Sequence, residues 1–158
     1  MKHIIAVVVE NQPGVLARVV GLISGRGYNI DSLNVAPTQD ASTSRITMVV
    51  PGDDRVLEQV TKQLNKLVDV IKVHDFTGER YLDRELMLVK VMTSQKNRTA
   101  AIELASLFNA RIVSVQSKSL TIQMVGASDD VDNLLELLRP NGILELSRSG
   151  VIAVGKQD

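Results

Sequence analysis

The sequence predicts an α+β protein in which two units share the element order β-α-β-β-α-β. β-branched runs alternate with stretches whose apolar residues recur at helical spacing, and this succession occurs once in residues 1–77 and again in residues 78–158. In the split βαβ, or ferredoxin-like, arrangement with this order, two helices cover one face of an antiparallel sheet. We therefore expect two ferredoxin-like units in tandem.

The first unit begins with a β-branched run over residues 3–10 that ends at a Pro-Gly turn, which predicts a largely buried strand. Apolar residues at helical spacing predict a helix over 15–23, and Gly25 and Gly27 supply its end. The elements expected next are strands over 28–36 and 44–50, a helix capped by Asp53 and reaching Leu67, and a strand over 68–76.

The second unit follows a charged stretch, residues 77–84, that is typical of a short linker. The predicted elements are a strand over 85–92, a helix over 98–108, strands over 111–116 and 119–125, a helix over 130–138 and one or two strands within 143–154. The two halves share no obvious residue identity, so the repeat is one of architecture.

Composition excludes several classes of function. Eighteen Lys and Arg balance eighteen Asp and Glu, and there are two Phe, two Tyr and no Trp, so the chain lacks the charge and the stacking surfaces that nucleic acids require. Cys is absent, which excludes disulfides and thiolate chemistry. No apolar stretch approaches the roughly 20 residues that span a bilayer. We expect a soluble, cytoplasmic protein that binds neither nucleic acid nor membrane.

No group of residues predicts catalysis or metal binding. The only histidines, His3 and His74, lie outside any metal-ligand spacing and are expected as ordinary strand or surface residues. Two acidic pairs stand where helices begin, where carboxylates cap backbone N–H groups: Asp53-Asp54 and Asp129-Asp130.

The turn formed by residues 11–14 is the one candidate binding feature. Asn11 and Gly14 place a small polar side chain and a residue without Cβ at the start of the first helix. Such a helix end exposes unpaired N–H groups and about half a positive charge, enough to hold a carboxylate. Alternatively, Asn11 merely caps the helix and Pro13-Gly14 merely turns the chain, and the residues alone favour this plainer interpretation.

The segment "ENQPGVLARVVGLISGRGYNIDSLNVAPTQDASTSRITMVV" resembles the regulatory (small) subunits of acetolactate synthase, also called acetohydroxyacid synthase, of bacterial type. The likeness continues through "GDDRVLEQVTKQLNKLVDVIKV", "RELMLVKV" and "RSGVIAV", and so covers nearly the whole chain. It implies an ACT domain over residues 1–77, for effector binding and dimerisation, and the C-terminal ferredoxin-like domain of the small subunit over 78–158.

The resemblance implies a protein without chemistry of its own. Such a subunit binds and activates the catalytic (large) subunit in the biosynthesis of valine, leucine and isoleucine. It also confers feedback inhibition by valine or another branched-chain amino acid. No cofactor is expected in this chain, because thiamine diphosphate, FAD and magnesium would belong to the large subunit. The resemblance also implies a homodimer with the effector at the interface between two chains.

The same resemblance assigns effector-binding residues in two groups. The loop after the first strand supplies one group, and the start of the second strand of the neighbouring chain supplies the other; they are Asn11, Gly14, Val15 and Leu16, and Asn29 and Ile30. The assignment is physically sensible, because N–H groups near Gly14 can take a carboxylate and the two Asn side chains can bond the charged ends of an amino acid. Val15 and Ile30 would surround its apolar side chain.

Three other functions remain to be weighed. A free-standing ACT-type sensor acting on another enzyme would share the 11–14 loop but has no reason to share "RELMLVKV" and "RSGVIAV". An enzyme of acylphosphatase type has the same ferredoxin-like fold and binds an anion at the first loop, but it resembles chemistry that needs an Arg within that loop. Here the loop reads Asn11-Gln12-Pro13 and has no Arg. An RNA-binding sheet would need exposed aromatic and basic residues on its central strands, and "IIAVVV" and "RITMVV" offer neither.

Overall fold

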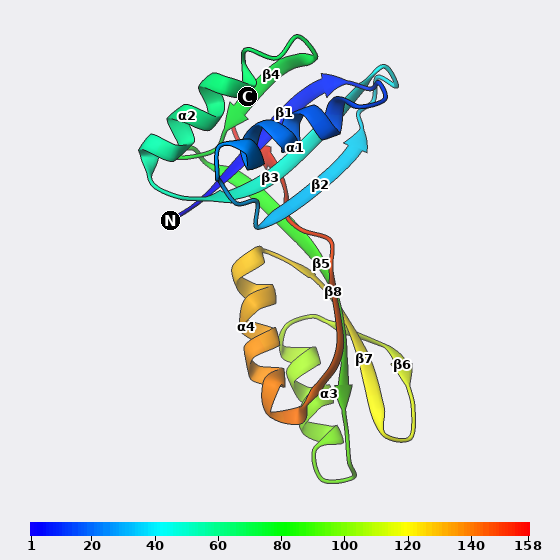
Figure 1. The fold of residues 1–158 in the computed structure, drawn as a ribbon. Helices are drawn as coiled ribbons and strands as arrows, with labels where there is room; N and C mark the ends of the chain where they lie inside the picture. Colours follow the sequence, from blue (N-terminus) through cyan, green and yellow to red (C-terminus); the bar gives the residue numbers. More distant parts are fainter. The chain divides into compact units, whose positions relative to one another are not determined.

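The computed structural model describes residues 1–158 and shows two compact units, each with its own sheet and pair of helices (Figure 1). The first unit comprises Met1–Leu82 together with Gly150–Asp158, and the second comprises Asp83–Ser149. The element order β-α-β-β-α-β occurs in each unit, so the predicted α+β class with two ferredoxin-like units is confirmed. No helix combines the length and the apolar character needed to cross a lipid bilayer.

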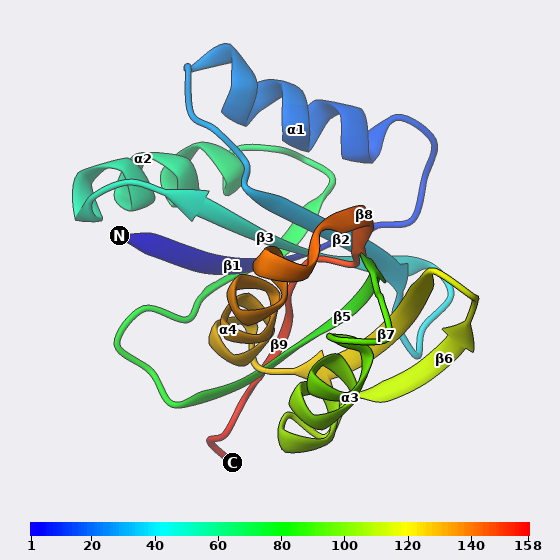
Figure 2. The same ribbon diagram turned by 90° about the horizontal axis from the view of Figure 1, so that it is seen from below.

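The first unit is an antiparallel sheet with the strand order β2-β3-β1-β4. Helices α1 and α2 lie on the same face of this sheet (Figure 2). In chain order the elements are β1 (Lys2–Glu10), α1 (Val15–Gly25), β2 (Ser32–Pro37), β3 (Thr43–Pro51), α2 (Asp54–Leu64) and β4 (Val70–Asp75). Strand β2 forms one edge of the sheet, a position that matters for the candidate site below.

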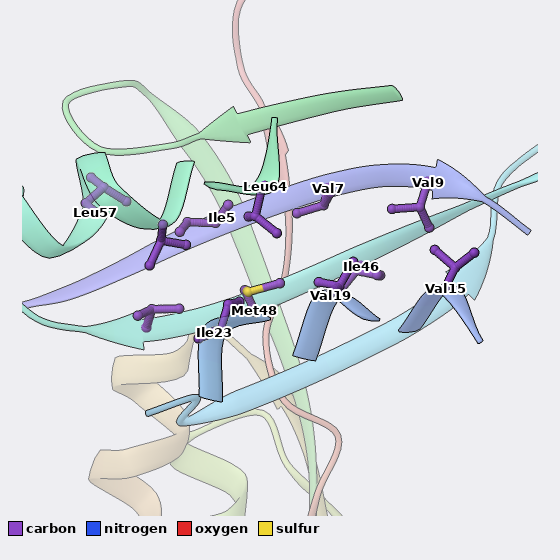
Figure 3. Packing of buried hydrophobic residues seen from close by; sticks show 12 residues of the cluster. Ile5, Val7, Val9, Val15, Val19, Ile23, Ile46, Met48, Leu57 and Leu64 are labelled. Carbon is purple, nitrogen blue, oxygen red and sulfur yellow. The ribbon is translucent and has the colours of Figure 1, made fainter. Parts of the chain in front are cut away.

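Alternating residues of β1 build the core between the sheet and the helices. Ile5, Val7 and Val9 point toward the helices, as Figure 3 shows, and each is at most 2% exposed. Val15 and Val19 of α1 meet them from the other side. Burying each such aliphatic side chain contributes about 1.5–3 kcal/mol, so this layer is the main reason that the first unit folds.

The opposite face of the same sheet is covered by the end of the chain. Strand β9 (Ile152–Gly155) pairs with β5, and Ala153 clusters with Ala6 and Phe76. The backbone carbonyl of Ala153 also accepts a hydrogen bond of 2.8 Å from the Arg45 guanidinium of β3. The chain end therefore packs in the first unit, whereas the sequence placed it with residues 78–158. Its pairing is long-range, which local periodicity does not reveal.

The second unit has the strand order β6-β7-β5-β8, again antiparallel, with its own aliphatic core against two helices. Its elements are β5 (Tyr81–Met92), α3 (Arg98–Leu107), β6 (Arg111–Val115), β7 (Ser119–Gly126), α4 (Ser128–Leu138), a 3₁₀ turn (Arg139–Asn141) and β8 (Ile143–Arg148). Strand β5 starts four residues before the predicted strand at 85, so part of the expected linker is extended. The pairing with β9 supports this early start.

A charged cluster lies partly buried in the second unit. The Arg148 guanidinium donates to both carboxylate oxygens of Glu85, at 2.6 and 2.8 Å, and the Glu85 side chain is only 3% exposed. Arg148 also contacts the Asp132 carboxylate on α4 at 2.7 Å. The hydrogen bonds that Arg148 donates to Glu85 raise the pKa of Arg148 above its usual range. This cluster ties β5, β8 and α4 together.

The two predicted acidic helix caps and the buried histidine differ in their outcomes. His3 is buried between Thr77 Oγ1 and the Gly52 carbonyl, so it is a hydrogen-bonded strand residue as expected. Asp53 caps α2 by accepting the Val56 N–H at 3.0 Å, also as expected. Asp129 and Asp130 make no such cap: they lie in the first turn of α4, and Asp83 accepts the N–H that begins this helix.

Candidate functional site

Asn11 fixes the loop between β1 and α1 to the loop between β2 and β3. Its backbone N–H donates to the Ser42 carbonyl at 2.8 Å, and its side-chain Nδ2 donates to the Ala41 carbonyl at 3.0 Å. The side chain makes no bond to the helix, so the interpretation of Asn11 as a helix cap is wrong. Its Oδ1 receives no hydrogen bond and remains available as an acceptor.

The loop that receives Asn11 is itself held by local hydrogen bonds. The Asp40 carboxylate accepts from the Ser42 hydroxyl at 2.6 Å and from the Ser42 N–H at 2.9 Å. These two bonds favour the ionised carboxylate and lower the pKa of Asp40. Asn11 is therefore anchored to a loop of defined geometry.

Helix α1 begins with free backbone donors. Gly14 is the N-cap residue, with φ +84, and no side chain caps the helix. The N–H groups of Gly14, Leu16 and Ala17 have no acceptor in the chain, and that of Val15 reaches the Gln12 carbonyl only at 3.4 Å. These donors and the helix dipole create an environment suited to a carboxylate. The left-handed φ explains the glycine, because other residues adopt it at a cost.

The two apolar residues that follow Gly14 have different environments. Val15 is 2% exposed and points into the core beside Val9 (Figure 3), so only its backbone faces the loop. Leu16 is 39% exposed. Apolar contact at this end of the site would therefore come from Leu16 and not from the expected side chain of Val15.

Asn29 and Ile30 lie just before β2. Asn29 donates through Nδ2 to Asp31 Oδ1 at 2.9 Å, and the Asp31 N–H donates to the Val49 carbonyl at 2.8 Å. Ile30 is half-buried and packs against the core of the first unit. The start of β2 is thus held in register with the end of β3.

Within one chain these two groups of residues lie at opposite ends of the sheet. The register pairs Ser32 of β2 with Val49, next to the start of β1, whereas Pro37 pairs with Ser44, next to its end. Strand β2 has six residues, which is roughly 20 Å at about 3.3 Å per residue. The structure therefore brings together Asn11, Gly14, Val15 and Leu16, and separates them from Asn29 and Ile30.

The sequence pattern did not indicate Arg18, which lies beside the same loop. Its Nε and Nη2 both contact Asp69 Oδ2 at 2.8 Å. A Cβ atom built on Gly14 would lie 3.3 Å from its Nη1. The available signal was spacing, because residues four apart on a helix share a face and Arg18 follows Gly14 by four.

Comparisons with known proteins place this geometry in a family. Residues 5–72 match the model of the ACT domain of acetohydroxyacid synthase small-subunit-like proteins, and residues 84–157 match that of the small subunit of acetolactate synthase. A probable acetolactate synthase small subunit of Archaeoglobus fulgidus is 50% identical over 154 residues, which cover 98% of this chain and 96% of the relative. The chain belongs to the acetolactate synthase small-subunit family.

Two further members of the acetolactate synthase small-subunit family support the assignment. The acetolactate synthase isozyme 3 small subunit of Salmonella typhimurium is 43% identical and is matched over 100% of this chain and 98% of its own length. The crystal structure of the small subunit from Thermotoga maritima superposes with a TM-score of 0.89 at 31% identity, covering 100% of this chain and 99% of that one. The expected family is therefore confirmed. No group of three or more His, Asp or Glu side chains is placed to hold a metal ion.

Proposed function

We propose that this protein is the regulatory subunit of acetolactate synthase in the biosynthesis of valine, leucine and isoleucine. It binds and activates the catalytic subunit, and it confers feedback inhibition by valine or another branched-chain amino acid. It has no turnover of its own, and thiamine diphosphate, FAD and magnesium belong to the catalytic subunit. Membership of the small-subunit family and the ACT match of the first unit support this role.

The main support for an effector site shared by two chains is the distance between the two groups of predicted effector-binding residues. A single amino acid is far shorter than the roughly 20 Å that divides the 11–14 loop from Asn29, so one chain cannot use both groups on one effector. Strand β2 is an edge strand. Antiparallel pairing of β2 in two copies about a two-fold axis would set the start of one β2 beside the end of the other. The homodimer then contains two equal composite sites.

Each composite site matches the chemistry of a branched-chain amino acid. The free N–H groups of Gly14, Leu16 and Ala17 donate hydrogen bonds to the carboxylate. Asn11 Oδ1 and Asn29 of the partner subunit bond the ammonium group. Leu16 and Ile30 of the partner subunit surround the aliphatic side chain, since Val15 is committed to the core. Both charged ends and the apolar end of the effector thereby have a counterpart.

An effector at a dimer interface can regulate because it contacts both chains at once. It changes the activity of the catalytic subunit only by its differential affinity for two arrangements of the assembly. Couplings of this kind are typically about 1–3 kcal/mol, which is comparable to one or two hydrogen bonds to a charged group. A few contacts in the composite site are therefore sufficient.

Reconstitution with the large subunit of acetolactate synthase tests the proposal. Acetolactate formation from pyruvate is measured for the protein alone, for the large subunit alone and for the mixture, with and without valine, leucine or isoleucine. We expect no turnover by the protein alone and a higher activity in the mixture than in the large subunit alone. At least one of the three amino acids should lower the activity of the mixture, and calorimetry should detect its binding. Amino-acid binding without association with the large subunit would instead indicate a free-standing ACT sensor.

A further inference from the structure

Arg18 lies at the effector loop with part of its guanidinium unused. We propose that Arg18 binds the α-carboxylate of the effector directly through Nη1, and that Asp69 holds the guanidinium in position for this contact. The inference rests on the proposed function in one respect, because it takes the effector to be an amino acid bound at the 11–14 loop. It adds a charged recognition residue to the group Asn11, Gly14, Val15, Leu16, Asn29 and Ile30.

The Arg18 guanidinium lies close to the start of helix α1. Nη1 of Arg18 lies 3.3 Å from the position that a Gly14 Cβ would take, which is beside the N–H groups at the helix start. The Arg18 N–H itself donates to the Gly14 carbonyl at 3.1 Å, so this residue is tied to the loop through its backbone as well. A carboxylate that accepts the free N–H groups of Leu16 and Ala17 therefore lies within reach of the guanidinium.

The Arg18 guanidinium has N–H donors that Asp69 does not use. A guanidinium has five N–H donors in a fixed planar fork. In Arg18, Nε and Nη2 are both directed at one oxygen, Asp69 Oδ2, at 2.8 Å, and Nη1 donates to no group in the chain. Three donors remain free, the two of Nη1, which lies beside Gly14, and the second of Nη2. One carboxylate oxygen can thus bond the helix N–H groups while the other bonds Nη1, an arrangement that charge-assisted hydrogen bonds favour.

Asp69 explains why the guanidinium lies there. Its backbone carbonyl accepts the Glu10 N–H at 3.0 Å, which fixes Asp69 to the end of β1, directly before the loop. The side chains of Arg18 and Asp69 are 52% and 22% exposed, and an exposed ion pair of this kind contributes little to stability. Its consequence is the placement of a cation at the loop. The site then selects a free α-carboxylate over an amide or ester of the same amino acid.

Calorimetric titration of four proteins tests the inference: the wild type, Arg18→Met, Asp69→Asn and the control Arg55→Met, an exposed arginine on α2 without an ion-pair partner. Each is titrated with valine, leucine and isoleucine and with their amides. Arg18→Met should weaken the binding of the amino acid about ten- to a hundred-fold and leave the amide unaffected. Asp69→Asn keeps an acceptor oxygen that can hold the guanidinium and removes the negative charge that competes with the effector, so it should bind the amino acid at least as tightly as the wild type. Arg55→Met should match the wild type.

The design separates a direct contact from a structural role. If Arg18 acted only through its ion pair, Arg18→Met and Asp69→Asn would weaken binding alike, and that result overturns the inference, as does unchanged binding by Arg18→Met. Should circular dichroism show that Arg18→Met is unfolded, Arg18→Lys replaces it, with a smaller loss expected because the charge remains but the fork is gone. If the wild type binds none of the three amino acids, the proposed function itself fails.

Discussion

The loop between the first strand and the first helix differs between the two units of the chain. In the first unit, the helix starts at a left-handed glycine, Gly14, and leaves backbone N–H groups free. In the second unit, Ser94 and Asn97 close the corresponding loop: Asn97 Oδ1 accepts the Ser94 N–H at 2.6 Å and Ser94 Oγ accepts the Lys96 N–H at 3.3 Å. No side chain caps either helix. The units differ in the loop before the helix, because in the second unit the side chains of Ser94 and Asn97 bond N–H groups of their own loop, whereas in the first unit the Asn11 side chain bonds the Ala41 carbonyl of another loop.

The arginines beside these loops differ in the same way. Arg98 of the second unit donates to the carbonyls of Gln116 and Ser117, at 2.8 and 2.9 Å, in the loop between β6 and β7. Asn11 of the first unit makes the equivalent contact to a hairpin loop, which leaves Arg18 beside Gly14 with free donors. The two units thus share a topology and differ in a few loop residues, and the proposed effector site uses the loop of the first unit.

The largest expected effect concerns the ion pairs of the two units. Arg148→Met leaves the buried Glu85 carboxylate without its partner, which should lower the free energy of unfolding of the second unit by about 3–5 kcal/mol. Arg18→Met removes an exposed pair in the first unit and should cost less than about 1 kcal/mol. Denaturant unfolding followed by circular dichroism measures both. Equal losses in the two variants would contradict this difference in burial.

Gly14→Asp should abolish the effector response while activation of the catalytic subunit survives. The new carboxylate would occupy the anion position beside Arg18 and repel the effector, so affinity should fall by more than about a hundred-fold. Asp tolerates a left-handed φ better than most residues, so the fold should persist. Acetolactate formation against effector concentration measures the response. The matched change in the closed loop, Asn97→Asp, keeps its acceptor oxygen and should leave inhibition unchanged; loss of inhibition there would contradict the comparison.

Asn11→Ala and Asn29→Ala should each weaken the effector response. Each removes one hydrogen bond to a charged group of the effector, worth about 1.5–3 kcal/mol, or roughly ten- to a hundred-fold in affinity. Asn11→Ala also frees the loop from the Ala41 carbonyl, so its effect should be the larger of the two. Calorimetry with the effector measures both variants. Unchanged effector binding by both variants would mean that the 11–14 turn has only a structural role.

The smallest effect is expected for a variant that removes a hydrogen bond from the loop before α3 in the second unit. Asn97→Ala removes the acceptor of the Ser94 N–H and should lower the stability of the second unit by about 1 kcal/mol. Because the proposed effector site lies in the first unit, inhibition should stay at the wild-type level. Thermal unfolding and the reconstituted assay measure the two quantities. A changed effector response with intact folding would mean that the second unit also contributes to binding.

Local periodicity predicted nearly every helix and strand, because each buries one apolar face. It failed where pairing is long-range: β5 begins at Tyr81 and β9 joins the first unit through contacts between residues far apart in the sequence. Strand β2 begins at Ser32 and not at 28, since the Asp31 N–H first bonds across to the Val49 carbonyl. In the candidate site, the open helix start was predictable from Gly14, but the anchor of Asn11 on Ala41 and the position of Arg18 required the tertiary structure.

Each proposed effector site combines Asn11 of one chain with Asn29 of another. Chains that carry Asn11→Ala and chains that carry Asn29→Ala, with different affinity tags, can be co-expressed and the mixed dimer purified in two steps. This dimer should bind the effector with wild-type affinity at one site, because one of its two composite sites keeps both Asn residues. The matched control pairs a wild-type chain with a chain that carries both substitutions, and it should have no intact site. A wild-type site in the control and none in the mixed dimer would contradict the claim and place the whole site within one chain.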